Sequence, residues 1–417
     1  MTKNSSAYLV AACVSSSVLM TELFWTRIFS AEFYYTFAFL ILSFAVLGLS
    51  VGALFFKVAI RTPRERQLPV WLNCTGALIL AAVPAVFLLH LDFSKLISEP
   101  MQWNKLLGAI LLLGSPNFFA GMSLAQLFLS NGRDIPKLYR ADFLGATTGV
   151  LLFIVVMNVL GGVAALLLCA LPVFIAAVIT AEQWGKSVPV LVFAAASAYF
   201  LNTGELPEQA RQERAPVVYK HWDATAKIKV YEFDSTYRSI NIDNLANTPV
   251  YGLDDAQLAA SPVPFDIDVR NLIMQFPRCS FLSLGAGGGA DVVQALQYQA
   301  AEIHAVEVIP HINFMMKEGC LRSFSGDIYN DPRVTVVTED ARTYVRKYRN
   351  KFDVIYSLSS NTFAAFASGS FALAENYLFT KEAFKDYWKA LSDSGYMSLE
   401  HQFYVPRLVP ELIEALT

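Results

Sequence analysis

Hydrophobic positions follow two regimes along the 417-residue chain. Before residue 202 the apolar residues form long runs, and a membrane-spanning helix needs roughly 20 such residues. Six runs reach that length, at residues 7–29, 34–56, 69–91, 106–130, 141–160 and 162–181. A seventh run, Val188 to Leu201, is shorter, and its pattern fits either a crossing helix or one lying at the membrane surface. Residues 1–203 are therefore predicted to form a transmembrane bundle of six or seven helices.

The pattern changes after residue 203. Residues 204–216 are polar and are predicted to form a linker. Short alternating stretches between 217 and 270 predict a small antiparallel β extension. From residue 271 to 417, strand and helix signals alternate, which predicts a doubly wound parallel sheet with helices on both faces. The segments that carry this alternation are Phe281–Leu284, Asp291–Gln299, Ile303–Val308, Val334–Val337, Phe352–Leu358, Lys381–Leu391 and Tyr396–His401.

Composition agrees with a chain divided in this way. Hydrophobic residues make up 55% and charged residues only 16%, whereas soluble domains carry about 25% charged residues. A net charge of −3 argues against nucleic acid as a partner and leaves membrane lipid as the main non-protein surface. Cysteines and histidines are scattered without metal-ligand spacing, so no metal site is predicted.

Positive charges indicate how the helices would be oriented. They cluster in the loops after the second and fourth runs, at Lys57, Arg61, Arg64, Arg66, Arg133, Lys137 and Arg140. Because cytoplasmic loops carry such an excess, both loops and the N-terminus are expected in the cytoplasm. The second half of the chain is then cytoplasmic with six spans and extracytoplasmic with seven.

Glycines four residues apart occur in two of the apolar runs. Gly48 and Gly52 lie in the second run, and Gly145 and Gly149 lie in the fifth. Such pairs let two helix backbones approach closely, and here we expect them to pack helices of the same chain.

A glycine-rich turn carries the main chemical signal. In FLSLGAGGGADVVQAL, a strand runs into Gly285, Gly287, Gly288 and Gly289, and Asp291 opens the following helix. Glycines permit a tight turn and close approach of a ligand to the backbone. Glu307 ends the next strand, where a carboxylate accepts hydrogen bonds from a ribose, and Asp340 and Ala341 follow the third strand. The turn also fits an NAD or FAD site, but the Asp-Ala pair favours a ligand of the S-adenosylmethionine type.

Five blocks in order resemble the spermidine synthase family, in particular its membrane-fused bacterial members. These blocks are FLSLGAGGGADVVQAL, AVEVIP, DPRVTVVTEDARTYV, KFDVIYSLSS and AENYLFTKEAFKDYWKALSDSGYMSL. The resemblance implies an adenosylmethionine methyltransferase-like Rossmann domain and a bacterial inner-membrane location. It implies S-adenosylmethionine, its decarboxylated form or methylthioadenosine as ligand, with Glu307 on the ribose and Asp340 on the adenine amino group.

Two departures from the family bear on function. Leu358 stands where the family has the aspartate that binds and deprotonates the acceptor amine, and Glu375 is the candidate substitute, with a loop-ordering role as its alternative. After Tyr396–His401 and a short helix the sequence stops at Thr417, whereas the family normally adds two more strands. We therefore expect either that a partner protein or a second copy covers the open sheet edge, or that the sequence continues beyond Thr417. The sequence thus predicts a membrane-anchored aminopropyl- or methyltransferase that makes spermidine poorly, or a non-catalytic scaffold or ligand-sensing subunit.

Overall fold

The computed structural model describes residues 3–416 apart from 34–35, 61–64, 183–184, 210–211, 255–272, 274, 277, 359–377 and 401–404. The chain divides into two compact units, one made essentially of residues 1–212 and the other of the residues from Glu213 onward. We call them the helical unit and the α/β unit. The predicted Glu375 lies outside the described residues.

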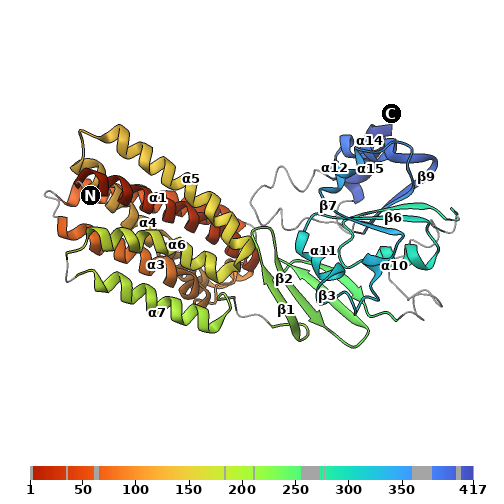
Figure 1. Cartoon of the computed structure of the whole chain (residues 1–417), viewed down its shortest axis with the longest axis horizontal. Helices are drawn as coiled ribbons and strands as arrows, with labels where there is room; N and C mark the ends of the chain where they lie inside the picture. The colour runs from red at the N-terminus through yellow and green to blue at the C-terminus, as the bar shows by residue number, and fades with distance from the viewer. Residues whose placement is uncertain are drawn as a thin grey trace. The chain divides into compact units, whose positions relative to one another are not determined.

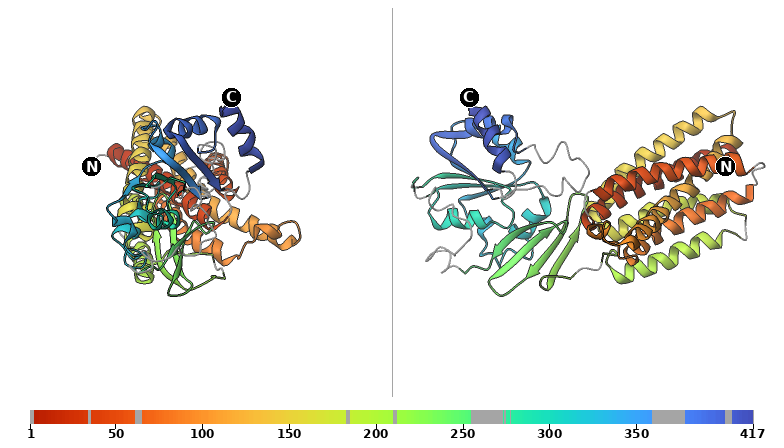
Figure 2. Two further views of the ribbon diagram at one scale, coloured as in Figure 1. Left: turned by 90° about the vertical axis from the view of Figure 1, so that its right-hand side faces the viewer. Right: turned by 180° about the vertical axis from the view of Figure 1, so that it is seen from behind.

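Seven helices of the helical unit lie side by side, within its described residues (Figures 1 and 2). Each predicted apolar run forms one helix, and the shorter seventh run is helical as well. The helices are α1 (Lys3–Glu32), α2 (Thr36–Ala59), α3 (Leu68–Leu88), α4 (Pro100–Ser130), α5 (Ile135–Val159), α6 (Gly161–Thr180) and α7 (Ser187–Thr203). Five described helices are long and apolar enough to cross a membrane, namely α1, α3, α4, α5 and α6.

Helix α1 packs against both α5 and α6. Phe24, Trp25 and Ile28 on α1 are fully buried in the apolar core of this unit. The Ser17 hydroxyl of α1 accepts a hydrogen bond from the Val173 amide of α6 at 3.1 Å. Val173 follows a proline inside α6, and a side-chain acceptor is one way to satisfy backbone groups near such a residue.

Glycines set how closely the helices approach. A Cβ added at Gly52 or Gly121 would run into backbone of α4 or α2 respectively, and one added at Gly145 would run into α1. These contacts join helices of one chain, as predicted for the glycine pairs. By contrast, a Cβ at Gly114 on α4 would lie 3.8 Å from the nearest heavy atom, the Phe44 carbonyl oxygen.

The α/β unit begins with an antiparallel sheet of four strands. Its strands follow one another in sequence order, as β1 (Val217–Trp222), β2 (Lys227–Glu232), β3 (Tyr237–Ile242) and β4 (Ala246–Tyr251). Strand β2 pairs with β3, and β3 with β4, in antiparallel register. The described part of the predicted β extension therefore has the expected form.

A parallel sheet of five strands follows, in the order β7-β6-β5-β8-β9. Each predicted strand and helix after residue 280 is present, with ends shifted by a few residues at most positions. The elements are β5 (Ser280–Leu284), α10 (Ala290–Gln297), β6 (Glu302–Glu307), α11 (Pro310–Lys317), β7 (Val334–Thr338), α12 (Ala341–Val345), β8 (Phe352–Leu358), α14 (Lys381–Ala390), β9 (Leu391–Glu400) and α15 (Val405–Leu416).

Helices cover both faces of this sheet. Alternate residues of β5 point into different cores: Phe281 joins a cluster with α10 and α11, while Leu282 and Leu284 join a cluster with α12 and α14. Alternation of this kind is what the two-residue period of a strand dictates. It confirms the predicted doubly wound arrangement, in which ligands bind at the carboxyl ends of the strands.

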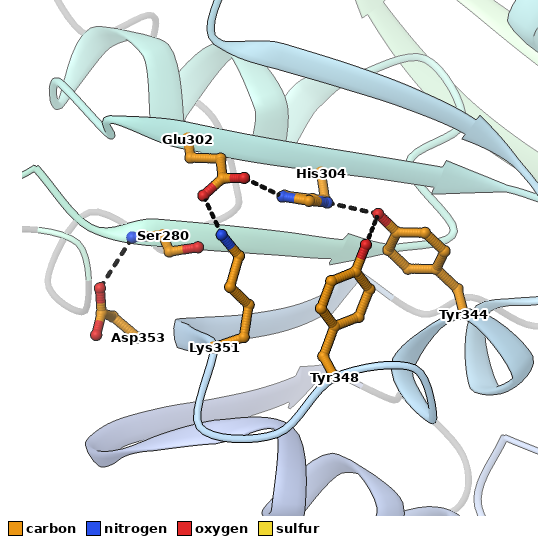
Figure 3. A network of polar contacts seen from close by, with 7 residues as sticks. All are labelled: Ser280, Glu302, His304, Tyr344, Tyr348, Lys351 and Asp353. Carbon is orange, nitrogen blue, oxygen red and sulfur yellow. Dashed lines mark hydrogen bonds and ion pairs between the residues drawn. The ribbon is translucent and has the colours of Figure 1, made fainter.

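A polar network ties the opposite, amino ends of these strands together (Figure 3). Glu302 at the start of β6 contacts Lys351 and the His304 Nε2 atom, the latter at 2.8 Å. The His304 Nδ1 atom lies 2.6 Å from the Tyr344 hydroxyl, which accepts a hydrogen bond from Tyr348. The Lys351 ammonium lowers the pKa of Glu302. The network therefore holds an ionised carboxylate at this end of the sheet.

We predict that Gly121→Ala destabilises the helical unit, because its methyl group would push α4 away from α2. Overpacking of this kind costs about 1–3 kcal/mol. Gly114→Ala on the same helix is the matched control, since its methyl group has room and alanine favours a helix by up to about 1 kcal/mol. Calorimetric unfolding of the purified chain in detergent should show a lower transition temperature for Gly121→Ala alone. Equal transitions for the two variants would contradict the proposed backbone contact.

Candidate functional site

The turn between β5 and α10 is built from glycines in left-handed conformations. Gly287 has φ +51° and Gly289 has φ +77°, a region that residues with a side chain adopt only at a cost. The amides of Gly285 and Ala286 bond back to the Val306 carbonyl oxygen of β6, at 2.9 and 3.0 Å. The strand therefore ends abruptly and the backbone bends next to the carboxyl end of the neighbouring strand.

Glu307 lies against this turn, as the sequence predicted. Its Oε2 atom accepts a hydrogen bond from the Gly287 amide at 3.1 Å, and its Oε1 atom accepts one from the Ile309 amide at 2.9 Å. The residue is only 6% exposed. Burial raises the pKa of Glu307, although the backbone amides act in the opposite direction. The carboxylate is thus fixed in orientation at the carboxyl edge of the sheet.

Two residues that the sequence did not single out also hold the turn. The Thr248 hydroxyl of β4 accepts a hydrogen bond from the Gly288 amide at 2.8 Å, and the Tyr329 hydroxyl donates to the Gly287 carbonyl oxygen at 2.8 Å. Both come from segments without a recognisable binding motif, so only the fold reveals them. The β extension is consequently a wall of the candidate site.

Contact between β4 and the turn is direct. A Cβ added at Gly288 would overlap the Pro249 carbonyl oxygen, and one added at Gly287 would lie 2.6 Å from the Thr248 hydroxyl. Gly288 therefore leaves no room for a side chain beside the Pro249 backbone, while Gly287 requires glycine both for its contact with Thr248 and for its left-handed conformation.

Asp291 is buried beside the same turn, in the first turn of α10, with 4% exposure. Its Oδ1 atom accepts a hydrogen bond from the Val292 amide at 3.0 Å. Burial, followed by the negative charges of Asp291 and Glu307, raises the pKa of Tyr329. Tyr329 therefore remains a protonated hydrogen-bond donor.

Asp340 and Ala341 occupy the carboxyl end of β7, the strand next to β6. Asp340 is the N-cap of α12, and its Oδ1 atom accepts a hydrogen bond from the Thr343 amide at 2.8 Å. Ala341 begins that helix and is buried. The structure thus puts both residues at the predicted edge and gives Asp340 a structural bond; its contact with adenine stays a prediction.

Comparison with known proteins agrees with this geometry. Residues 273–414 match the model of the family described as the spermine/spermidine synthase domain. Polyamine aminopropyltransferases from Clostridium perfringens and Alkaliphilus oremlandii are 30% and 31% identical to this chain over 122 residues. The α/β unit contains a spermidine-synthase-like domain. The match covers 29% of this chain and 39% of the length of each of these relatives.

Solved structures that are similar to part of this chain have lower sequence identity. They include a spermidine synthase in complex with the transition-state analogue AdoDATO and the spermidine synthase from Thermotoga maritima, at 19% and 20% identity. Each alignment covers 48% of this chain and 62% of the other chain, with a TM-score of 0.33.

Leu358 ends β8, the strand next to β5 in the spermidine-synthase-like sheet. Its backbone pairs in register with Glu400 of β9. Leu358 therefore stands at the carboxyl edge, where the resemblance implies the catalytic aspartate. The hydrocarbon side chain of leucine cannot accept a proton from an amine.

We predict that Thr248→Val loosens the glycine turn of the spermidine-synthase-like domain. Valine keeps the shape of threonine but leaves the Gly288 amide without its acceptor, and an unsatisfied buried donor costs about 1–3 kcal/mol. Hydrogen–deuterium exchange of the peptide that contains Gly288 should accelerate in Thr248→Val. Thr248→Ser, which keeps a hydroxyl, should exchange like the unmodified chain. Unchanged protection in Thr248→Val would show that this bond does not hold the turn.

Proposed function

We propose that this chain is a membrane-anchored, spermidine-synthase-like protein whose α/β unit binds S-adenosylmethionine or decarboxylated S-adenosylmethionine. The observation that carries the proposal is the buried Glu307 carboxylate, bonded to the Gly287 amide at 3.1 Å. This pairing combines an acceptor for a ribose diol with a stretch of backbone that a ligand can approach closely.

Glu307 retains capacity for a ligand in its observed position. An ionised carboxylate offers about four lone-pair sites. The backbone amides of Gly287, Val308 and Ile309 use some of these sites, and their hydrogen bonds act against the burial that raises the pKa of Glu307. Ribose hydroxyls that reach this edge would stabilise the charged form in the same way as the amides do. Asp340, at the end of the adjacent strand, would then accept a hydrogen bond from the adenine amino group.

Aminopropyl transfer requires a base in the site in addition to the groups that bind the donor. A neutral amine attacks the carbon next to the donor's sulfonium; a C–N bond forms, the C–S bond breaks, and methylthioadenosine leaves as the thioether. The amine must also lose a proton, and a positioned base typically contributes about 10²–10⁴-fold to the rate of such a step. With leucine at position 358, ordinary spermidine synthesis should be slow unless Glu375 supplies the base.

A ligand-sensing or scaffold subunit is the second candidate function. It is favoured by Leu358, because the site keeps the groups expected for binding while lacking the one expected for proton transfer. A transferase that moves an aminopropyl or methyl group to an amine or to a lipid-proximal acceptor remains the alternative use of the same site.

Membrane anchoring is supported by the helical unit. Its five long apolar helices suit a bilayer, and we place the protein in a bacterial inner membrane in line with the family resemblance. In the described part of the parallel sheet, β9 and β7 form the two edges. A partner protein or second copy at the β9 edge stays a prediction.

We predict that Glu307→Ala weakens binding of decarboxylated S-adenosylmethionine by about 1–3 kcal/mol, the range for hydrogen bonds to a charged group. Glu302→Ala is the matched control, because both acids belong to β6 and Glu302 lies at its opposite end. Titration calorimetry should detect the loss for Glu307→Ala alone, with S-adenosylmethionine and methylthioadenosine as further ligands. Equal affinity in both variants would remove Glu307 from the site. Calorimetric unfolding of each variant separates lost binding from lost fold.

We also predict that the unmodified chain forms little spermidine from putrescine and decarboxylated S-adenosylmethionine, and that Leu358→Asp forms more. The introduced carboxylate can hold and deprotonate the amine, within the roughly 10²–10⁴-fold range of a positioned base. Leu358→Asn, similar in size but without a base, is the control. Rapid spermidine formation by the unmodified chain would contradict this prediction.

A further inference from the structure

One end of the helical unit gathers the basic loops. Arg66, in the loop before α3, forms an ion pair with Glu182, in the loop before α7, with Nε and Oε1 2.7 Å apart. At the start of α1, the Tyr8 hydroxyl hydrogen-bonds Asp134 in the loop before α5. Exposed ion pairs add little stability, but these contacts show which loops lie together. We call this the basic end of the bundle.

The chain that leaves α7 is attached to the other end. Leu206 is 6% exposed and belongs to the apolar core of the helical unit, and it packs against Gly162 at the start of α6. The Gln209 side-chain amide donates to the Leu91 carbonyl oxygen at 3.0 Å, and the Gln209 backbone amide donates to Glu32 at 3.4 Å. These contacts involve the end of α1, the segment after α3 and the start of α6. We call this the linker end.

Helix α7 connects the two ends. It follows the loop that contains Glu182 and finishes at Thr203, three residues before Leu206. Along its length it contacts α6 and α3, including Phe193 against Phe174 with ring centroids 5.6 Å apart. Figures 1 and 2 show it running beside these helices. A helix lying flat at one surface would not bring residues 206 and 209 to the linker end.

The outward side of α7 suits lipid. No charged residue occurs between Ser187 and Thr203, and Val190, Leu191 and Leu201 are more than half exposed. A solvent-facing helix normally turns polar residues outward. At about 1.5 Å per residue its 17 residues extend roughly 25 Å, at the short end of the range for spanning helices.

We propose that α7 crosses the membrane and that the α/β unit lies on the side opposite the basic loops, outside the cytoplasm. This inference rests on the membrane anchoring proposed above and settles the choice between six and seven spans. Basic residues are more numerous in the loops and helix ends on the basic side than on the linker side. By sequence, the basic side has Lys3, Lys57, Arg61, Arg64, Arg66, Arg133, Lys137, Arg140 and Lys186, and the linker side has Arg27, Lys95, Lys105, Arg211 and Arg214. Such a bias places the basic end in the cytoplasm.

The orientation changes which ligand the site can meet. A sulfonium donor made in the cytoplasm would not reach a site on the outer side without export. The site would instead sample adenosyl compounds that are present outside the cell membrane, such as thioether nucleosides of the methylthioadenosine type. This favours the ligand-sensing alternative over a transferase that draws on the cytoplasmic donor.

Thiol labelling of the full-length chain tests the inference directly. Cys320 is exposed in the α/β unit, whereas Cys169 and Cys279 are buried. A variant that keeps Cys320 and replaces Cys13, Cys74, Cys169 and Cys279 by alanine therefore reports on the α/β unit. Two controls add Cys320→Ser and one new cysteine each. Gly132→Cys marks the basic end, where a Cβ has open space; Ile97→Cys marks the linker end, where Ile97 is 100% exposed.

Spheroplasts that contain each variant are treated with a charged maleimide that does not cross the membrane. We expect Cys320 and Ile97→Cys to be labelled in intact spheroplasts, and Gly132→Cys only after permeabilisation. Labelling of Cys320 only after permeabilisation, like Gly132→Cys, would overturn the inference. Labelling in denaturant measures the total thiol of each variant. Recovery of the chain in the soluble fraction would instead refute the membrane anchoring on which the inference rests.

Discussion

Direct contact between backbones, made possible by glycine, is the constraint on which both units depend. In the helical unit, Gly52, Gly121 and Gly145 let neighbouring helices touch without side chains between them. In the α/β unit, Gly288 does the same between the turn and β4. Where no hydrophobic force acts between helices in lipid, such close packing is a main source of association. At the turn it brings the candidate site and the β extension into one rigid edge.

Much of the fold could be predicted because its signals are local. Long apolar runs became helices, and the strand Phe352–Leu358 was predicted to the residue, since a short buried strand between charged positions has a clear pattern. The meeting of Glu307 with the glycine turn followed from one rule, that parallel strands end at a shared edge. The hydrogen bond between them, donated by the Gly287 amide, could not be predicted from the sequence.

What could not be predicted depends on contacts between distant segments. Thr248 and Tyr329 reach the turn from 40 and 42 residues away, and no local motif marks either. The path of α7 was ambiguous because its length lies between two classes. The contacts of Gln209 from which we infer that path join residues 118 and 177 positions apart in sequence. Asp340 was predicted for its position and turned out also to cap α12, a role that short polar residues commonly take.

The network around His304 has a consequence for how such a protein can evolve. Glu302 and Glu307 stand at opposite ends of one strand, and each belongs to a separate set of polar contacts. Contacts that join the amino ends of the strands, such as Asp353 with the Ser280 amide, do not involve the glycine turn. Substitutions at the carboxyl edge, where the candidate site lies, can therefore accumulate while the sheet stays intact. A lineage could in this way exchange one chemistry for another, or lose catalysis altogether, and still inherit a stable domain.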